Sequence, residues 1–301
     1  MSNHSKRLLI TGGAGFIGGA FIRKLLKDSN YNIFNIDKLS YASDITSIVN
    51  IDKSTSRHSF FKQDIRDKEA LKNLFNEIDP DLVINFAAES HVDRSLDDPS
   101  IFIESNILGT FNLLESARSH WRNLSKDRKK TFKFHHISTD EVYGSLNRKS
   151  NPFNETSRYD PRSPYAASKA SSDHLVKSWY YSFGLPTLIT NCSNNYGPYQ
   201  FPEKLIPLSI LKLYNEKKIP LYGDGSHIRD WLYIDDHIEA ILLVIEKGKI
   251  GSNYCIGGFG EKSNKEVVSK ICQIMDKHYP KLFSHIELIE NVKDRPGHDK
   301  R

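Results

Sequence analysis

The sequence predicts an α/β protein in which a doubly wound parallel sheet of the Rossmann type carries a smaller second α/β lobe. Three observations lead to this prediction. Apolar, β-rich segments alternate with segments of helical period up to about residue 193, and a glycine-rich turn joins the first such pair. Beyond that point prolines and glycines break the pattern. The 301 residues are also enough for two lobes.

The alternating segments can be assigned one by one. Strands are predicted at residues 7–10, 32–36, 58–62, 81–86, 132–138 and 187–192, and helices at 15–26, 68–78, 100–121 and 166–183. Strands that are each followed by a helix form a parallel sheet with helices on both faces, because the crossover connections are right-handed.

The second lobe is predicted from the change in composition. Pro198, Pro202, Pro207 and Pro220 interrupt the chain, and several glycines follow. We expect a dinucleotide-binding lobe at 1–193, to which 231–250 returns, and a substrate-binding lobe made of 194–230 and 251–301.

Composition narrows the class of protein. The net charge is +5 and the pI about 8.9, but the one dense basic stretch, residues 126–130, is short and is predicted to be a solvated loop. We therefore expect no nucleic-acid partner, and an excess of positive charge also suits a phosphate-bearing substrate.

Without a long apolar run or an export signal, the chain is expected neither to enter nor to cross a membrane. Cys192, Cys255 and Cys272 lie far apart without metal-ligand spacing, which indicates a reducing cytoplasm and no metal.

A dinucleotide site is predicted at the first turn. Gly12, Gly15 and Gly18 follow a strand and open a helix, which allows a tight turn and close approach of a pyrophosphate to the helix N-terminus. Asp37 ends the next strand about 20 residues after Gly18, where a carboxylate binds the adenosine ribose. It would repel a 2′-phosphate, so NAD is favoured over NADP, although Lys38 follows directly. Asp64 and Ile65, after the third strand, are expected beside the adenine.

Tyr165 and Lys169 are predicted to move a proton. Their i, i+4 spacing places them on one helical face, where an ammonium favours the phenolate and lowers the tyrosine pKa. Such a pair also occurs by chance on helix surfaces, but here it follows a dinucleotide motif. Thr139, after the fifth strand, can hydrogen-bond the reacting hydroxyl.

Asp140 and Glu141 directly follow Thr139 at the predicted carboxyl edge of the sheet. Simple dehydrogenation needs no extra acids. A β-elimination does, since one group removes a carbon-bound proton and another protonates the leaving hydroxyl. The alternative is that both acids cap the loop or pair with lysines.

These motifs resemble the extended short-chain dehydrogenase/reductase family and, within it, its nucleotide-sugar 4,6-dehydratase branch. The similarity runs nearly end to end, through TGGAGFIG at 11–18, DKLSYA at 37–42, AAESHVDRS at 87–95, ISTDEVYG at 137–144, SPYAASKASSDHLV at 163–176, NCSNNYGPYQFPEKLIP at 191–207, IRDWLYIDDH at 228–237 and DRPGHD at 294–299. The glycine and tyrosine–lysine motifs indicate only the superfamily, whereas Asp140–Glu141, EKLIP and DRPGH indicate the dehydratases.

The resemblance implies a closed redox cycle on dTDP-glucose, as in deoxysugar biosynthesis. Tyr165 would deprotonate the C4 hydroxyl while NAD takes the C4 hydride. Glu141 would then remove the C5 proton, Asp140 would protonate the departing C6 hydroxyl, and the hydride would return to C6. The product would be the 4-keto-6-deoxy sugar nucleotide.

The resemblance also implies binding roles. Besides Tyr165 and Lys169, it gives a cofactor set of Gly12, Gly15, Phe16, Ile17, Gly18, Asp37, Lys38, Leu39, Ser40, Asp64, Ile65, Ala87, Ala88, Glu89, Ser90, Ser105 and Asn195. For the substrate it gives His91, Thr139, Asn194, Lys204, Leu205, Pro220, Leu221, Tyr222, Arg229, Asn264, Asp294, Arg295, Pro296, Gly297 and His298.

Alternatives stay open at this point. They are a UDP-sugar 4,6-dehydratase, a nucleotide-sugar 4-epimerase or decarboxylase, and a non-enzymatic NAD-binding protein. A homodimer through the helices at 100–121 and 166–183 is expected. Family members usually continue for some tens of residues beyond the position of Arg301, so we expect either a fragment or a naturally short chain, with apolar surface exposed in the second lobe.

Overall fold

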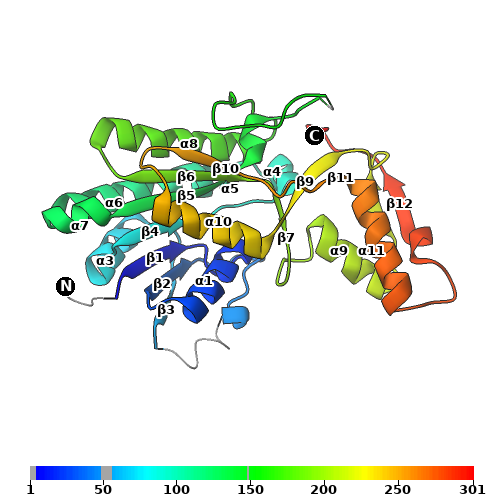
Figure 1. Ribbon diagram of the computed structural model, residues 1–301, viewed down its shortest axis with the longest axis horizontal. Coiled ribbons are helices and arrows are strands. Elements are labelled where there is room, and N and C mark those ends of the chain that lie inside the picture. The colour runs from blue at the N-terminus through cyan, green and yellow to red at the C-terminus, as the bar shows by residue number, and fades with distance from the viewer. Residues whose placement is uncertain (1–4, 49–55, 148) are drawn as a thin grey trace.

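A parallel sheet of seven strands dominates the first lobe (Figure 1). The computed structural model describes residues 5–48, 56–147 and 149–301. The sheet runs in the order β10-β6-β5-β4-β1-β2-β3, with β1 (Arg7–Thr11), β2 (Asn32–Asp37), β3 (His58–Lys62), β4 (Leu82–Asn85), β5 (Lys133–Thr139), β6 (Thr187–Cys192) and β10 (Asn253–Ile256). Every neighbouring pair is parallel. The strand order reverses between β1 and β4, which leaves a crevice where ligands bind in such folds. The predicted fold class is confirmed.

Helices cover both faces of this sheet (Figure 1). One face is packed by α1 (Phe16–Asp28) and α10 (Ile234–Lys247), and the other by α3 (Lys68–Ile78), α6 (Thr110–Asn123) and α8 (Pro164–Phe183). Their apolar stripes bury Phe21 and Ile241 on the first face and Leu113 and Val176 on the second. The sheet is thus apolar on both sides, as a parallel sheet requires.

Shorter elements connect this framework. They are α4 (Val92–Asp97), α5 (Ser100–Phe102), η1 (Ile103–Gly109), α7 (Lys126–Thr131) and η2 (Asp140–Tyr143). The helix predicted at 100–121 is present as α5, η1 and α6 in succession, but η1 is π-helical. The basic stretch predicted as a loop is instead the short helix α7, in which Arg128 contacts Asp79 and Asp81.

The second lobe contains α9 (Leu205–Tyr214), β8 (Ile219–Tyr222), α11 (Asn264–His278), η3 (His285–Leu288) and β12 (Ile289–Val292) around its own core. A small sheet of β7 (Asn194–Tyr196), β9 (Ile228–Tyr233) and β11 (Glu261–Ser263) lies between the lobes (Figure 1). The chain returns to the first lobe as far as Ile256, beyond the expected 231–250, because β10 pairs with β6. Within the described part of the chain, no helix has the length and apolar character needed to cross a membrane.

Candidate active site

A cavity of about 800 Å³ lies between the lobes at the carboxyl ends of β1, β2, β4, β5 and β6. All five residues predicted to be catalytic line this cavity, namely Thr139, Asp140, Glu141, Tyr165 and Lys169. It is also lined by every predicted cofactor and substrate residue except Leu39, Asp294, Pro296 and Gly297. Sequence motifs from the first and the last parts of the chain are therefore brought to one site.

The glycine turn leaves room for a pyrophosphate. Gly12 has φ +71°, and a Cβ there would lie 2.6 Å from the backbone N of Ala87. A Cβ on Gly18 would lie 2.4 Å from the carbonyl oxygen of Gly12, so this position tolerates no side chain. A Cβ on Gly15 would meet only that carbonyl oxygen, at 3.3 Å, and otherwise open space. The helix N-terminus is thus accessible to an anion, as the binding of a dinucleotide requires.

Asp37, which is predicted to bind a ribose, is held in place by hydrogen bonds. Its Oδ2 accepts from Ala14 N (3.0 Å), and its Oδ1 accepts from Leu39 N (2.8 Å) and Ser43 Oγ (3.2 Å). Leu39, with φ +59°, therefore contributes its N–H to Asp37, while its side chain stays outside the cavity. Lys38 is paired with Glu89 at 2.6 Å, so it is not a free cation for a 2′-phosphate. A carboxylate at Asp37 and a Lys38 that is paired with Glu89 fit NAD rather than NADP.

Asn106, in η1, is a residue that sequence reasoning missed. Its Oδ1 accepts from Glu89 N (2.8 Å), and its Nδ2 donates to Glu89 O (3.0 Å) and to Ser168 Oγ (2.8 Å). The π-helical turn places this amide against Glu89, which lines the cavity, and beside α8. A π-helical insertion inside a long helix often marks a functional site, but no sequence period predicts one.

Tyr165 and Lys169 lie on the same face of α8, whose first turn is fixed by Ser163 Oγ accepting from Ala166 N and by Pro164. Burial and the nearby Glu141 raise the pKa of Tyr165 well above its ordinary value, while a hydrogen bond with Thr139 opposes this. Lys169 Nζ donates to the carbonyl of Ile137 at 2.8 Å. The expected lowering of the tyrosine pKa by Lys169 is not found: burial dominates, and the group that opposes the increase is Thr139.

Asp140 and Glu141 form the first turn of η2, directly beside Thr139. Burial, followed by the neighbouring Glu141, raises the pKa of Asp140 to about 7. Burial also raises the pKa of Glu141, but Arg229 and Lys204 oppose that increase. Burial thus favours the neutral form of both acids, and the cations oppose it at Glu141, so the two neighbouring acids can differ in protonation as an acid and a base in one site must.

Cations from the second lobe face these acids. Arg229 Nη1 donates to Asp299 O (2.9 Å), and Lys204 Nζ donates to Ser90 O (3.0 Å). Arg295 Nη1 contacts Asp93 Oδ1 at 2.7 Å. Asp93 also lines the cavity and was not predicted, since a lone acid on a short helix carries no spacing signal.

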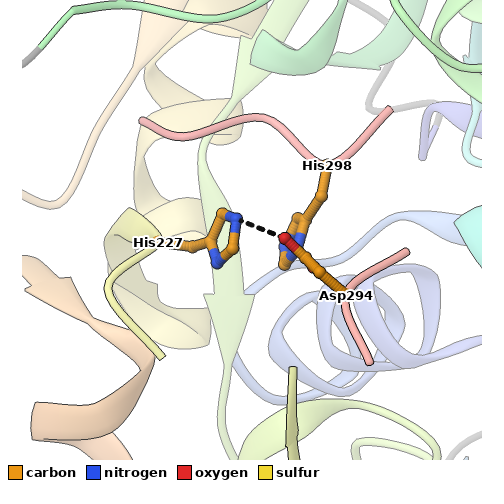
Figure 2. A group of neighbouring side chains, drawn as sticks. All are labelled: His227, Asp294 and His298. Carbon is orange, nitrogen blue, oxygen red and sulfur yellow. Dashed lines mark hydrogen bonds and ion pairs between the residues drawn. The ribbon is translucent and has the colours of Figure 1, made fainter. Parts of the chain in front are cut away.

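His227, Asp294 and His298 gather at the edge of the cavity (Figure 2). Asp294 Oδ2 lies 3.2 Å from His227 Nε2, and Asp294 Oδ1 lies 2.7 Å from His298 Nδ1. The two rings are stacked at 3.6 Å with planes 15° apart. An imidazole binds a metal in its own ring plane, so these parallel rings cannot both ligate one ion as they stand. The cluster orders the segment at 294–298, of which Arg295 and His298 reach the cavity.

The other members of that segment have structural contacts. Gly297 has φ +67°, and a Cβ there would lie 2.9 Å from Arg162 O, so the segment packs against the loop that precedes α8. Asp294, Pro296 and Gly297, which were predicted to bind the nucleotide diphosphate, lie outside the cavity lining in this state.

Comparisons with known proteins show the family of this chain. A sequence model of the GDP-mannose 4,6-dehydratase family matches residues 9–301. The chain belongs to the GDP-mannose 4,6-dehydratase family. The dTDP-glucose 4,6-dehydratase of Salmonella typhimurium is 52% identical over 303 residues, which cover 98% of this chain and 84% of that protein.

Solved structures of family relatives also match. The dTDP-glucose 4,6-dehydratase DesIV of Streptomyces venezuelae, with NAD and TYD bound, superposes with a TM-score of 0.88 at 40% identity over 98% of this chain and 87% of that one. The UDP-glucose 4-epimerase of Thermus thermophilus, in complex with NAD, gives 0.83 at 28% identity over 98% of this chain and 89% of that one. The 4,6-dehydratase and epimerase scaffolds are thus close, and the side chains in the cavity must distinguish the two activities.

Proposed function

We propose that this protein is an NAD-dependent lyase that converts dTDP-glucose to dTDP-4-keto-6-deoxyglucose and water. The observation that carries the proposal is the adjacent Asp140 and Glu141, which share a buried cavity with Tyr165 and a dinucleotide turn. A 4-epimerase needs only the oxidation and reduction of C4. Two further acids at the reacting end of the cavity have a use only if C5 loses a proton and C6 loses its hydroxyl.

The first step is oxidation at C4. Bound NAD supplies a hydride acceptor that is regenerated in the same turnover. The positive charge of its oxidised ring also favours the phenolate of Tyr165. Tyr165 takes the proton of the C4 hydroxyl, and Thr139 holds that hydroxyl through its side-chain oxygen. The resulting 4-ketone makes the C5 proton acidic.

The second step is elimination. Glu141 removes the C5 proton, and Arg229 and Lys204 favour its carboxylate form because they oppose the rise of its pKa. Asp140, with a pKa of about 7, donates its proton to the C6 hydroxyl, and water leaves. Hydride addition at C6 and a proton at C5 then restore the saturated sugar. The net change is the loss of one water.

The nucleotide is assigned from the relatives. The Salmonella protein is named for dTDP-glucose, and the DesIV structure contains TYD. Lys204, Arg229 and Arg295 line the part of the cavity in the second lobe, and guanidinium groups suit the oxygens of a diphosphate. We assign 1–193, with the chain returning as far as Ile256, to cofactor binding, and the remainder to the substrate.

Product analysis tests the proposal. The protein is incubated with NAD and either dTDP-glucose or UDP-glucose, and the products are separated and identified by mass and NMR. A 4-keto-6-deoxy product from dTDP-glucose is expected, at a higher kcat/KM than from UDP-glucose. Inversion at C4 without loss of water would instead establish an epimerase, and tight NAD binding without turnover would establish a binding protein.

We also infer a homodimer, through the outer faces of η1, α6 and α8. Ile103, Leu108 and Tyr181 are 44, 52 and 77% exposed there. An exposed apolar surface of this kind marks an interface. Leu108→Glu is expected to halve the sedimenting mass, whereas Leu243→Glu, on α10 and equally exposed at 52%, is the matched control. An unchanged mass in Leu108→Glu contradicts this interface.

The three unpaired cysteines are consistent with a reducing cytoplasm.

A further inference from the structure

A chain of buried polar groups extends from Lys169, in the lining of the cavity, into the interior of the protein. It comprises Lys169 and Asp173, one turn apart on α8, and His136 on β5. Their exposed fractions are 3, 0 and 0%. Burying three ionisable side chains together is costly unless they satisfy one another, so the arrangement calls for a function.

The hydrogen bonds fix the state of His136. Thr11 Oγ1 accepts from Ala87 N and donates to Asn85 Oδ1 at 2.7 Å, which sets the orientation of the Asn85 amide. Asn85 Nδ2 therefore faces His136 Nδ1, at 3.1 Å, and donates to it. The proton of the neutral imidazole is then on Nε2. Burial lowers the pKa of His136 well below its ordinary value, so the ring stays neutral.

Asp173 is built as a buried carboxylate. Its Oδ2 accepts from Ser138 Oγ (2.9 Å), Tyr159 OH (2.9 Å) and Asn191 Nδ2 (3.0 Å). Its Oδ1 faces His136 Nε2 at 3.5 Å. Burial raises the pKa of Asp173, whereas Lys169 and the three donated hydrogen bonds oppose that increase. Three donors to one oxygen favour the ionised form.

Lys169 lies on the other side of the same imidazole. Its Nζ is 3.3 Å from His136 Nε2 and donates to Ile137 O. The groups that face this ammonium are His136 from β5, Cys192 from β6 and Asp173 from its own helix. Burial lowers the pKa of Lys169 to about 8, and Asp173 is the main charge that opposes the decrease. The ammonium is therefore retained at neutral pH by a small margin.

We propose that Asp173 is a positioning residue for the dehydratase reaction: its carboxylate is the counter-charge that keeps Lys169 protonated, and His136 separates the two groups. This inference rests on the proposed function, because Lys169 assists Tyr165 only as a cation. No group of this chain changes its covalent bonds in this role. Asp173 acts through Lys169 and never touches the substrate.

The test is Asp173→Asn, which nearly keeps the size of the side chain and removes its charge. The titration of Lys169 is followed by NMR of protein labelled at lysine ¹³Cε, with the signal assigned by its loss in Lys169→Arg. The pKa of Lys169 is expected to fall by at least about one unit, and the alkaline limb of the rate of C4 oxidation, a step in which Asp140 takes no part, to move down in pH with it. The rate of C4 oxidation above both pKa values should then fall about tenfold. NAD affinity should not change. Asp127→Asn, which removes a carboxylate that is 94% exposed on α7, is the control.

The outcomes separate the two hypotheses. A Lys169 pKa and an alkaline limb that are the same in Asp173→Asn and in the unchanged protein overturn the inference. If the unchanged protein does not turn over dTDP-glucose, the proposed function fails, while the NMR titration still decides the role of Asp173. Should Asp173→Asn not fold, Tyr159→Phe removes one donor and retains the charge. Because the charge is kept, the Lys169 pKa and the alkaline limb should both stay in place, and a fall of both in Tyr159→Phe would contradict a role of the Asp173 charge.

Discussion

The neutral form of Asp140 is expected to limit the elimination step at high pH. Burial and Glu141 raise its pKa to about 7, above the 3.8 of an ordinary aspartate. A general acid acts only while protonated, so its contribution is present below this pKa and is lost as the pH rises through it. With a pKa of 7, about nine-tenths of the molecules carry this proton at pH 6 and about one-tenth at pH 8. The rate of water loss should therefore fall about ninefold to tenfold between these pH values.

Asp140→Asn removes the proton donor and nearly keeps the shape of the side chain. Loss of a positioned general acid typically slows its step by about 10² to 10⁴. Oxidation at C4 needs only Tyr165, so it should continue, and reduced nicotinamide should accumulate. Rapid mixing with dTDP-glucose, followed by its absorbance and by quenched-product analysis, measures the two steps separately. A flat pH profile for water loss, or an Asp140→Asn variant that eliminates at the normal rate, would refute this assignment.

Three further changes probe the remaining roles. Tyr165→Phe should abolish hydride transfer and leave NAD affinity intact, and residual single-turnover reduction of NAD would contradict the base assignment. Glu141→Gln should slow exchange of the C5 proton with solvent, measured with deuterium, much more than C4 oxidation; an equal loss of both would argue against a specific C5 base. Asp37→Asn should weaken NAD binding by about tenfold, as expected for losing one charge-assisted hydrogen bond, and calorimetry that shows unchanged affinity would remove it from the ribose site.

Local sequence signals predicted where the residues of the expected cofactor half lie in the fold. The boundaries of β3 and α3 agree with the hydrophobic period, and the Gly12 turn and Asp37 follow one another within a single βαβ unit. Steric and hydrogen-bonding rules act there over a few residues, so a single sequence suffices. The acid pair after β5 was predicted for the same reason, since a parallel strand delivers its next residues to the carboxyl edge of the sheet.

Long-range contacts were beyond the sequence. Asp93 and Arg295 are far apart in the chain, and nothing in their spacing predicts that they pair. The π-helical turn that aims Asn106 at Glu89 depends on how the helix packs against α8, not on propensity. Leu39 was likewise predicted from its segment as a cofactor contact. Its backbone has a positive φ, and its N–H donates a hydrogen bond to Asp37. Tertiary packing decides these details.

The pKa values of the two acids in the cavity depend on cations of the second lobe. Two adjacent carboxyls in one cavity do not both ionise without a cost in free energy, and nearby cations reduce that cost. Arg229, Lys204 and Arg295 act on Glu141, and the charge that Glu141 keeps then raises the pKa of Asp140. Arg229 and Arg295 come from β9 and from the segment before the C-terminus, and Lys204 directly precedes α9. A substrate diphosphate bound to these same cations would weaken their effect on Glu141 and raise its pKa, so the carboxylate would be a stronger base in the molecules in which it stays ionised. The elimination rate then depends both on the strength of this base and on the fraction of Glu141 that remains anionic.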